Sequence, residues 1–150
     1  MSIVATDIQF FKSSNPNSDG GVITPTQIVD AVLNNLFPDT TGDQAATGNT
    51  TYRKVFVKNN HGTLTWQDVK FWIEAQVQSD ETIGIALGTP TDTDGTAPTY
   101  VFPSDKSTAI AIGDLVPFGE QGLWVRRVTP AGSTAFPNAS SRLKLEGDSL

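Results

Sequence analysis

The single histidine is the first residue whose side chain is suited to catalysis or metal binding. His61 follows Asn59 and Asn60 and precedes Gly62, and these residue types are typical of a turn. A Ser-His-Asp triad would have to be built on that turn, and a Cys-His pair is excluded because the chain contains no cysteine. One histidine is also too few for a histidine-rich zinc site. We therefore expect His61 to be an exposed turn residue.

The acidic run Asp92-Thr93-Asp94-Gly95 matches the middle of a calcium-binding loop. When an EF-hand pattern is aligned on this run, its first ligand position falls on Pro90 and its final glutamate position falls on Val101. Neither of these side chains has an oxygen to offer the ion. We therefore expect a surface turn here and no metal site.

Carboxylates that lie far apart in the chain could still pair for glycoside hydrolysis. The candidates fall at predicted strand ends or in loops, where acidic side chains are usually solvated. They are Glu74, Asp80, Glu81 and Glu120. Gly20-Gly21 has neither the spacing nor the following lysine of a phosphate-binding loop. The sequence therefore favours a protein that is not an enzyme and binds no cofactor.

Tryptophans and adjacent basic residues could contact a partner. Tryptophans can stack on sugars, as in a carbohydrate-binding module, but aromatic residues in sheets more often pack in a core or at an interface. Trp72 falls on the polar face of an alternating strand, so it is either exposed or covered by another element. Each basic pair would place one cation on either face of a strand, and arginine among aromatic residues is common at interfaces. The predicted interface residues are Arg53, Lys54, Trp72, Trp124, Arg126 and Arg127.

The composition indicates which class of protein must position these residues. A chain of 150 residues fits one domain with a core, and 13 glycines, 9 prolines and 37% hydrophobic residues favour short strands joined by loops. The formal net charge of −6 argues against binding to nucleic acid. No run approaches the roughly 20 apolar residues of a membrane span, and the N-terminus has no visible secretion signal. We expect a soluble protein with no membrane partner.

Alternating apolar and polar residues predict that most of the positioning elements are β-strands. Residues 52–59 form a strongly β-prone run that ends in the Asn/Gly turn, and residues 69–76 alternate strictly. Further short strands are predicted near residues 8–12, 82–88, 99–103, 109–113, 122–132 and 141–147. Regularly spaced strands of this kind predict an all-β fold, either a β-sandwich or a barrel-like single domain.

One short helix is predicted within residues 24–35, although a loop competes with it. Thr24 offers a capping hydroxyl, Pro25 would occupy the first helical position, and Gln27 could reach back to the cap. Residues 1–25 are then expected to form an N-terminal strand and arm, and residues 26–150 the β-sandwich, within one domain overall. Long loops are expected at residues 38–51 and 89–98.

Four ordered blocks of the chain carry a recognisable pattern: DIQFFKS at 7–13, GGVIT at 20–24, YRKVFVKN at 52–59 and LWVRRVTPAG at 123–132. These blocks resemble a family of small virion structural proteins from tailed bacteriophages. They spread over most of the chain and are structural patterns, not catalytic motifs. The resemblance implies a non-enzymatic component of the virion, made in the host cytoplasm, with the major capsid protein or other virion proteins as partners.

The hypothesis from the sequence is a capsid decoration (cement) protein, oligomeric, that stabilises the shell by bridging capsomers. The polar arm at residues 1–25 and the loop at 38–51 suit such contacts, because polar segments can wrap a large surface when they order on binding. Three alternatives stay open: a tail, baseplate or head-to-tail connector component, a carbohydrate-binding module, and a small hydrolase.

Overall fold

The fold is all-β, as the sequence predicts. The computed structural model describes residues 1–15, 20–29, 32, 34–76, 79–134 and 140–149. A 3-10 turn (Ala5–Asp7) precedes the first strand, and the described residues contain one α-helix, α1 (Gly42–Thr47). The strands are β1 (Ile8–Asn15), β2 (Gly20–Gln27), β3 (Asn49–Asn59), β4 (Trp66–Gln76), β5 (Thr82–Leu87), β6 (Ile110–Leu115), β7 (Glu120–Thr129) and β8 (Ser141–Ser149).

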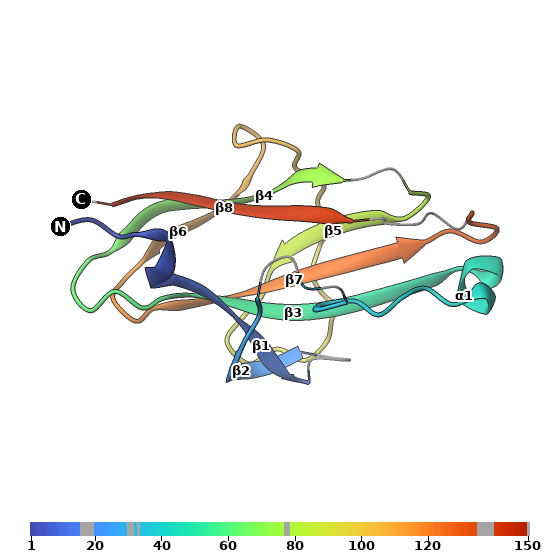
Figure 1. The fold of residues 1–150 in the computed structure, drawn as a ribbon, viewed down its shortest axis with the longest axis horizontal. Helices are drawn as coiled ribbons and strands as arrows, with labels where there is room; N and C mark the ends of the chain where they lie inside the picture. The colour runs from blue at the N-terminus through green and yellow to red at the C-terminus, as the bar shows by residue number, and fades with distance from the viewer. Residues whose placement is uncertain (16–19, 30–31, 33, 77–78, 135–139, 150) are drawn as a thin grey trace.

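The strands form two antiparallel sheets that pack face to face. A five-stranded sheet has the order β2-β1-β3-β7-β5, and a three-stranded sheet has the order β6-β4-β8. Figure 1 shows the two layers, with β4 and β8 above β3 and β7. The core lies between the two sheets, and the alternation of side chains along β3 and β7 explains how it forms. Val55, Val57, Leu123 and Val125 are buried and face the second sheet.

Residues 88–109 connect β5 to β6 and form what we call the strap. Its first part lies on the outer face of the five-stranded sheet, where Asp92 contacts Lys54 of β3. The strap then passes the free edge of β5, where Val101 forms a bridge with Ile85. Its last part lies over the three-stranded sheet (Figure 1). The strap therefore covers outer faces of both sheets.

The predicted helix at residues 24–35 is wrong in its position. Thr24, Pro25 and Gln27 belong to β2, and the Thr24 hydroxyl donates to the Lys12 carbonyl of β1 at 2.8 Å. No helix forms in the described part of the remaining segment, and residues 30, 31 and 33 lie outside the described residues. The cap signal fails here because the hairpin with β1 supplies the hydrogen bonds that a helix would have used.

The helix forms instead within residues 38–51, where a loop was predicted. Thr41 Oγ1 accepts the N–H of Gln44 at 3.2 Å, and Gln44 Oε1 accepts the N–H of Thr41 at 3.0 Å. This reciprocal pair is the capping box that the Thr24 segment lacks. Among the described residues, no helix has the length and apolar character needed to cross a membrane. The strand predicted at residues 99–103 is reduced to the single bridge at Val101.

Candidate functional site

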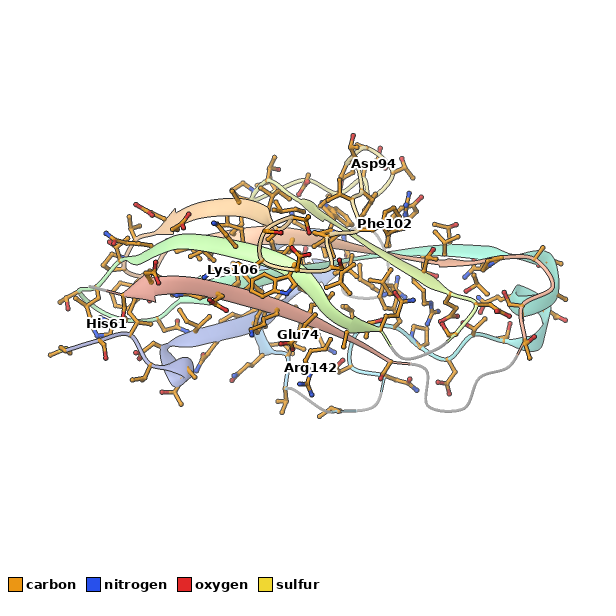
Figure 2. All side chains as sticks on the ribbon, turned by 90° about the horizontal axis from the view of Figure 1, so that it is seen from above. His61, Glu74, Asp94, Phe102, Lys106 and Arg142 are labelled. Atoms are coloured by element: carbon orange, nitrogen blue, oxygen red, sulfur yellow. The ribbon has the colours of Figure 1, made fainter. Side chains whose placement is uncertain are left out.

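His61 is held by the turn between β3 and β4. Its Nδ1 accepts the backbone N–H groups of Thr63 and Leu64 at 3.2 and 3.0 Å, and the residue is half-buried, not exposed as predicted. Figure 2 shows His61 well apart from Glu74 and Asp94. Across the described ranges, no three histidine, aspartate or glutamate side chains are grouped to hold a metal ion. The visible role of His61 is to shape its turn.

The carboxylates considered for glycoside hydrolysis take part in contacts that hold the fold. Glu81 accepts the hydroxyl of Thr129 at 2.9 Å, and Glu74 forms an ion pair with a lysine of β8 at 3.2 Å. Asp80 accepts a backbone N–H at 2.7 Å, and Glu120 stands opposite a lysine of β3. Each of these contacts is explained by the fold alone, without a substrate.

The calcium-like run supplies the main polar contact of the strap. Asp92 pairs with the Lys54 ammonium, and its other carboxylate oxygen accepts the indole N–H of Trp124 at 2.8 Å. Lys54 also donates to the carbonyls of Gly21 at 2.8 Å and of Asp92 at 3.1 Å. Asp94 caps its own turn by accepting the Thr96 N–H at 2.9 Å. The two aspartates thus serve different local contacts, and the run is a turn, as predicted.

The charge state of Asp92 follows from this environment. Burial disfavours the charged carboxylate, but the hydrogen bonds from Lys54 and Trp124 outweigh it, so the pKa of Asp92 lies below its usual range. The Lys54 side chain has no exposed surface. A buried ammonium requires such a partner, because an unpaired charge in the interior is strongly unfavourable. Asp92, Lys54 and Trp124 form what we call the strap clamp.

The two arginines of the inner face form a second cluster. Arg53 and Arg127 both lie near the ring of Phe37, with guanidinium carbons 5.7 and 4.9 Å from the ring centroid. Arg127 donates to the Pro38 carbonyl at 2.8 Å and lies 3.9 Å from the Glu81 carboxylate. Burial, and then the charge of Arg127, lower the pKa of Arg53. The cluster joins the segment before α1 to β3 and β7.

Arg126 lies on the outer face with the second half of the strap. Its guanidinium carbon is 4.7 Å from the ring centroid of Tyr100 and 5.6 Å from that of Phe102. The Tyr100 hydroxyl donates to the Gly95 carbonyl at 2.7 Å, and burial raises the pKa of this hydroxyl. These contacts secure the strap downstream of the strap clamp.

The six predicted interface residues lie mostly inside the chain. Trp124 is fully buried and Trp72 is 5% exposed, and the Lys144 ammonium lies 5.5 Å from the Trp72 ring centroid. Trp72 is therefore covered, one of the two outcomes that its strand pattern predicted. Neither ring presents a face for a sugar in this structure. Of the six, Arg53, Lys54, Trp72, Trp124 and Arg127 are buried, and Arg126 is half-buried.

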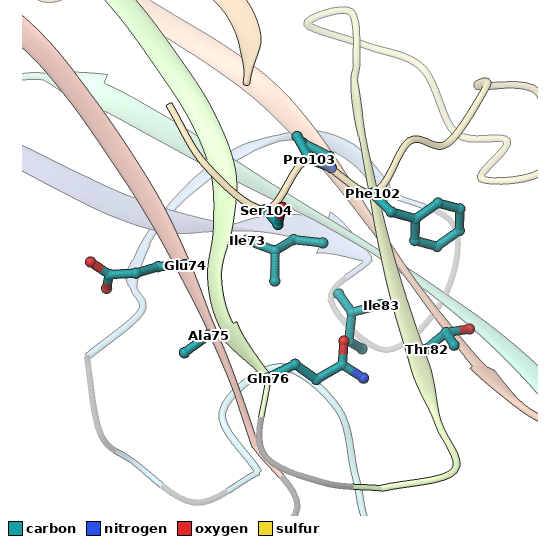
Figure 3. Close-up of a pocket in the computed structure, with 9 residues that line it drawn as sticks. All are labelled: Ile73, Glu74, Ala75, Gln76, Thr82, Ile83, Phe102, Pro103 and Ser104. Carbon is teal, nitrogen blue, oxygen red and sulfur yellow. The ribbon is translucent and has the colours of Figure 1, made fainter. Parts of the chain in front are cut away.

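A pocket of about 230 Å³ opens between the end of β4 and the start of β5. Figure 3 shows Ile73 and Ile83 lining it, with Phe102 of the strap at one side. Among the described residues that line the pocket, Glu74 is the one ionisable side chain, so they offer no paired acid and base. Its lining suits apolar contact better than catalysis.

Most of the exposed apolar residues that sequence reasoning missed lie in loops and at strand ends. The tip between β6 and β7 carries Val116 and Phe118, which are 57% and 61% exposed. Phe118 also has a φ of 62°, a left-handed conformation that is unfavourable for a bulky residue. The run Val116-Pro117-Phe118-Gly119 contains the turn signals that could have marked this tip.

No protein-family model, curated protein or solved structure matches this chain.

Proposed function

We propose that this chain is a non-enzymatic structural protein of a tailed-phage virion, most specifically a capsid decoration protein that stabilises the shell by bridging capsomers. The observation that carries the proposal is the set of four ordered blocks that resemble phage virion structural proteins. Those blocks fall in four of the five strands of the larger sheet, and the two longest of them lie in its central strands: residues 52–59 lie in β3, and residues 123–129 lie in β7. β3 and β7 pair along most of their length, and a shell component needs a stable sheet of this kind.

The contact surface of such a protein would come from its loops and termini, since the predicted interface residues are largely buried. The β6–β7 tip supports this view, because an exposed ring on a strained backbone is costly unless another role retains it. Exposed apolar side chains also occur at Met1 and Val4. The proposed partners are the major capsid protein or other virion proteins.

Binding only to the assembled shell would stabilise it by mass action. Particles assembled without this protein should therefore lose infectivity faster on heating and in low salt than particles that contain it. Adding the purified protein back should restore survival. If particles with and without this protein survived heat and low salt equally well, the proposed cement role would be wrong.

A tail, baseplate or connector component of the same particle is the alternative within this class. The exposed Val116 and Phe118 tip would serve such a contact equally well. Copy number separates the two, because a closed ring holds about a dozen copies whereas a decorated shell holds hundreds.

A further inference from the structure

β8 is an open edge of the three-stranded sheet. It pairs with β4, and within the described residues no strand pairs with its other side. An unpaired strand edge presents a row of backbone N–H and C=O groups on which another strand can pair. At nine residues, β8 is long enough to form a complete ladder with a partner.

The other described sheet edges carry features that discourage pairing. β2 contains Pro25 and has irregular register with β1. β6 has six residues and includes Gly113 at a φ of 87°, and the outer side of β5 is occupied by Val101. These are the usual protections of an edge strand.

Within the described residues, β8 lacks the covering segment, the short length and the proline of those edges, although it contains Gly147 and four charged side chains, which also discourage pairing with most strands. It contains no proline, and its register shifts against β4 place the extra residues in β4. Gln67 pairs with Asp148 and Lys70 with Glu146, so β4 advances three residues while β8 advances two. β8 is therefore a regular strand along its free edge.

The charges of β8 are arranged so that the strand is complementary to itself. Its outward face carries Arg142 and Lys144 in the first half and Glu146 and Asp148 in the second, whereas Leu143 and Leu145 pack toward the core. An antiparallel second β8 with Leu145 opposite Leu145 places Lys144 opposite Glu146 and Arg142 opposite Asp148. Twofold symmetry repeats each of these pairs.

Neighbouring registers are less complementary, because each has two attractive pairs in place of four and adds one like-charge pair. A shift by one pair of residues in either direction places Lys144 opposite Lys144, or Glu146 opposite Glu146, and like charges directly opposite one another destabilise a sheet. Although Lys144 and Glu146 form ion pairs within the chain, their side chains are 40% and 42% exposed. They remain accessible to a second strand.

We propose that two copies of this chain associate through β8, in antiparallel register centred on Leu145, so that their three-stranded sheets join into one. We choose a second copy as the partner strand because, in antiparallel pairing, the basic half of one β8 lies opposite the acidic half of the other. The proposal rests on β8 alone and holds whether or not the protein belongs to a virion. Dimerisation of the purified protein and survival of particles are measured separately, so failure of one leaves the other standing.

The test is analytical ultracentrifugation of the purified full-length protein over a range of concentrations, with charge-reversal variants of β8. The wild type should form a dimer. Lys144→Glu and Glu146→Lys should each weaken dimerisation by about tenfold or more, because each reversal turns two attractive pairs into repulsive ones. The double variant should restore dimerisation, since it exchanges the two charges and keeps the pairing. Lys12→Glu, in the other sheet, is the matched control and should dimerise as the wild type does.

Hydrogen exchange of the wild type gives a readout that does not depend on any variant. Backbone amides of β8 should become more protected as concentration rises through the dimerisation range, while those of β2 should not change. A wild type that stays monomeric at its highest soluble concentration would overturn the proposal. A dimer that ignores both single reversals, or that leaves β8 amides unprotected, would also overturn it.

Discussion

Lys54 shows how this fold accommodates a cation in its interior. The ammonium lies on the outer face of β3, yet it is removed from solvent, and the strap supplies the carboxylate and the carbonyl oxygen of Asp92 as partners. Gly21 of β2 supplies a second carbonyl oxygen. Trp124 completes the strap clamp by donating to the same carboxylate. Loss of the carboxylate would leave a buried positive charge without its counter-ion.

Asp92→Asn should therefore destabilise the protein substantially. We expect the free energy of unfolding to fall by about 2–3 kcal/mol, below the usual cost of breaking a fully buried pair because the Asp92 side chain is 26% exposed. Urea unfolding followed by tryptophan fluorescence measures this change. Asp94→Asn, two residues further along the strap, is the control and should leave the midpoint nearly unchanged. Equal midpoints for wild type and Asp92→Asn would contradict the role given to the strap clamp.

The same carboxylate should make stability depend on pH. The pKa of Asp92 is lowered in the folded protein, because the bonds from Lys54 and Trp124 outweigh the effect of burial. A lowered pKa contributes stability that is complete above the unfolded value of about 3.9 and is lost as the pH falls through the folded value. The difference in unfolding free energy between wild type and Asp92→Asn should thus be constant near neutral pH and shrink below about pH 4. A difference that grows on acidification would refute this assignment.

The sequence correctly predicted that the two residues of each basic pair, Arg53-Lys54 and Arg126-Arg127, lie on opposite faces of their strand. Lys54 and Arg126 lie on the outer face, and Arg53 and Arg127 on the inner face, because strand alternation decides which way each points. Their partners could not be predicted in the same way. Asp92 lies 38 residues from Lys54 in the chain, and alternation does not say which loop will cross a face.

Among the elements, the strap depends on close approach to the sheet beneath it. Gly95 is buried, and a Cβ placed there would lie 2.5 Å from Tyr52 Cβ. Any side chain at this position must lift the strap or displace Tyr52. The glycine is therefore required by space and not by an unusual backbone angle.

Gly95→Ala should lower the free energy of unfolding by about 1–3 kcal/mol, the usual cost of forcing extra volume into a packed site. Denaturant unfolding measures the loss, and a shift in tryptophan emission should accompany it because Trp124 lies directly beneath. Gly42→Ala is the matched control, since a Cβ at that position of α1 meets nothing within 4 Å. An unchanged midpoint for Gly95→Ala would show that the strap is not closely packed.

Phe118, in the β6–β7 tip, should lower the stability of the fold through its strained backbone, while its exposed ring remains open to contact with a partner. Phe118→Gly should raise the free energy of unfolding by up to about 1 kcal/mol, because glycine adopts a positive φ without steric cost. Phe118→Ala removes the same ring but keeps the strain, so it should give no such gain. Thermal unfolding of the two variants makes the comparison. If both variants unfolded at the same temperature as the wild type, the strain argument would fail.

Elements were predicted well where the local pattern and the tertiary pairing agree. β3, β4 and β7 followed from alternation, whereas the capping pattern at Thr24 and Gln27 pointed to a helix that the hairpin with β1 prevents. The equivalent pattern at Thr41 and Gln44 forms its helix because no strand claims that segment. Local signals alone could not distinguish these two outcomes.

For the whole molecule, the described residues form a β-sandwich whose strap covers outer faces of both sheets. The polar side chains considered as candidates for catalysis or metal binding form contacts within this scaffold, and most of the exposed apolar residues lie in its loops and at strand ends. This division suits a protein whose work is to contact neighbours in an assembly. The all-β fold could be predicted from strand spacing, but the contact surfaces could not, because they depend on which faces the strap leaves open.

The copy number of this protein in purified particles tests most directly the proposed role as a decoration protein of a phage shell. Quantitative mass spectrometry should find this protein in hundreds of copies per particle, in fixed proportion to the major capsid protein, as expected for a component repeated over a large shell. About a dozen copies would place it in a ring at the connector or tail instead. Its absence from purified particles would contradict a virion role altogether.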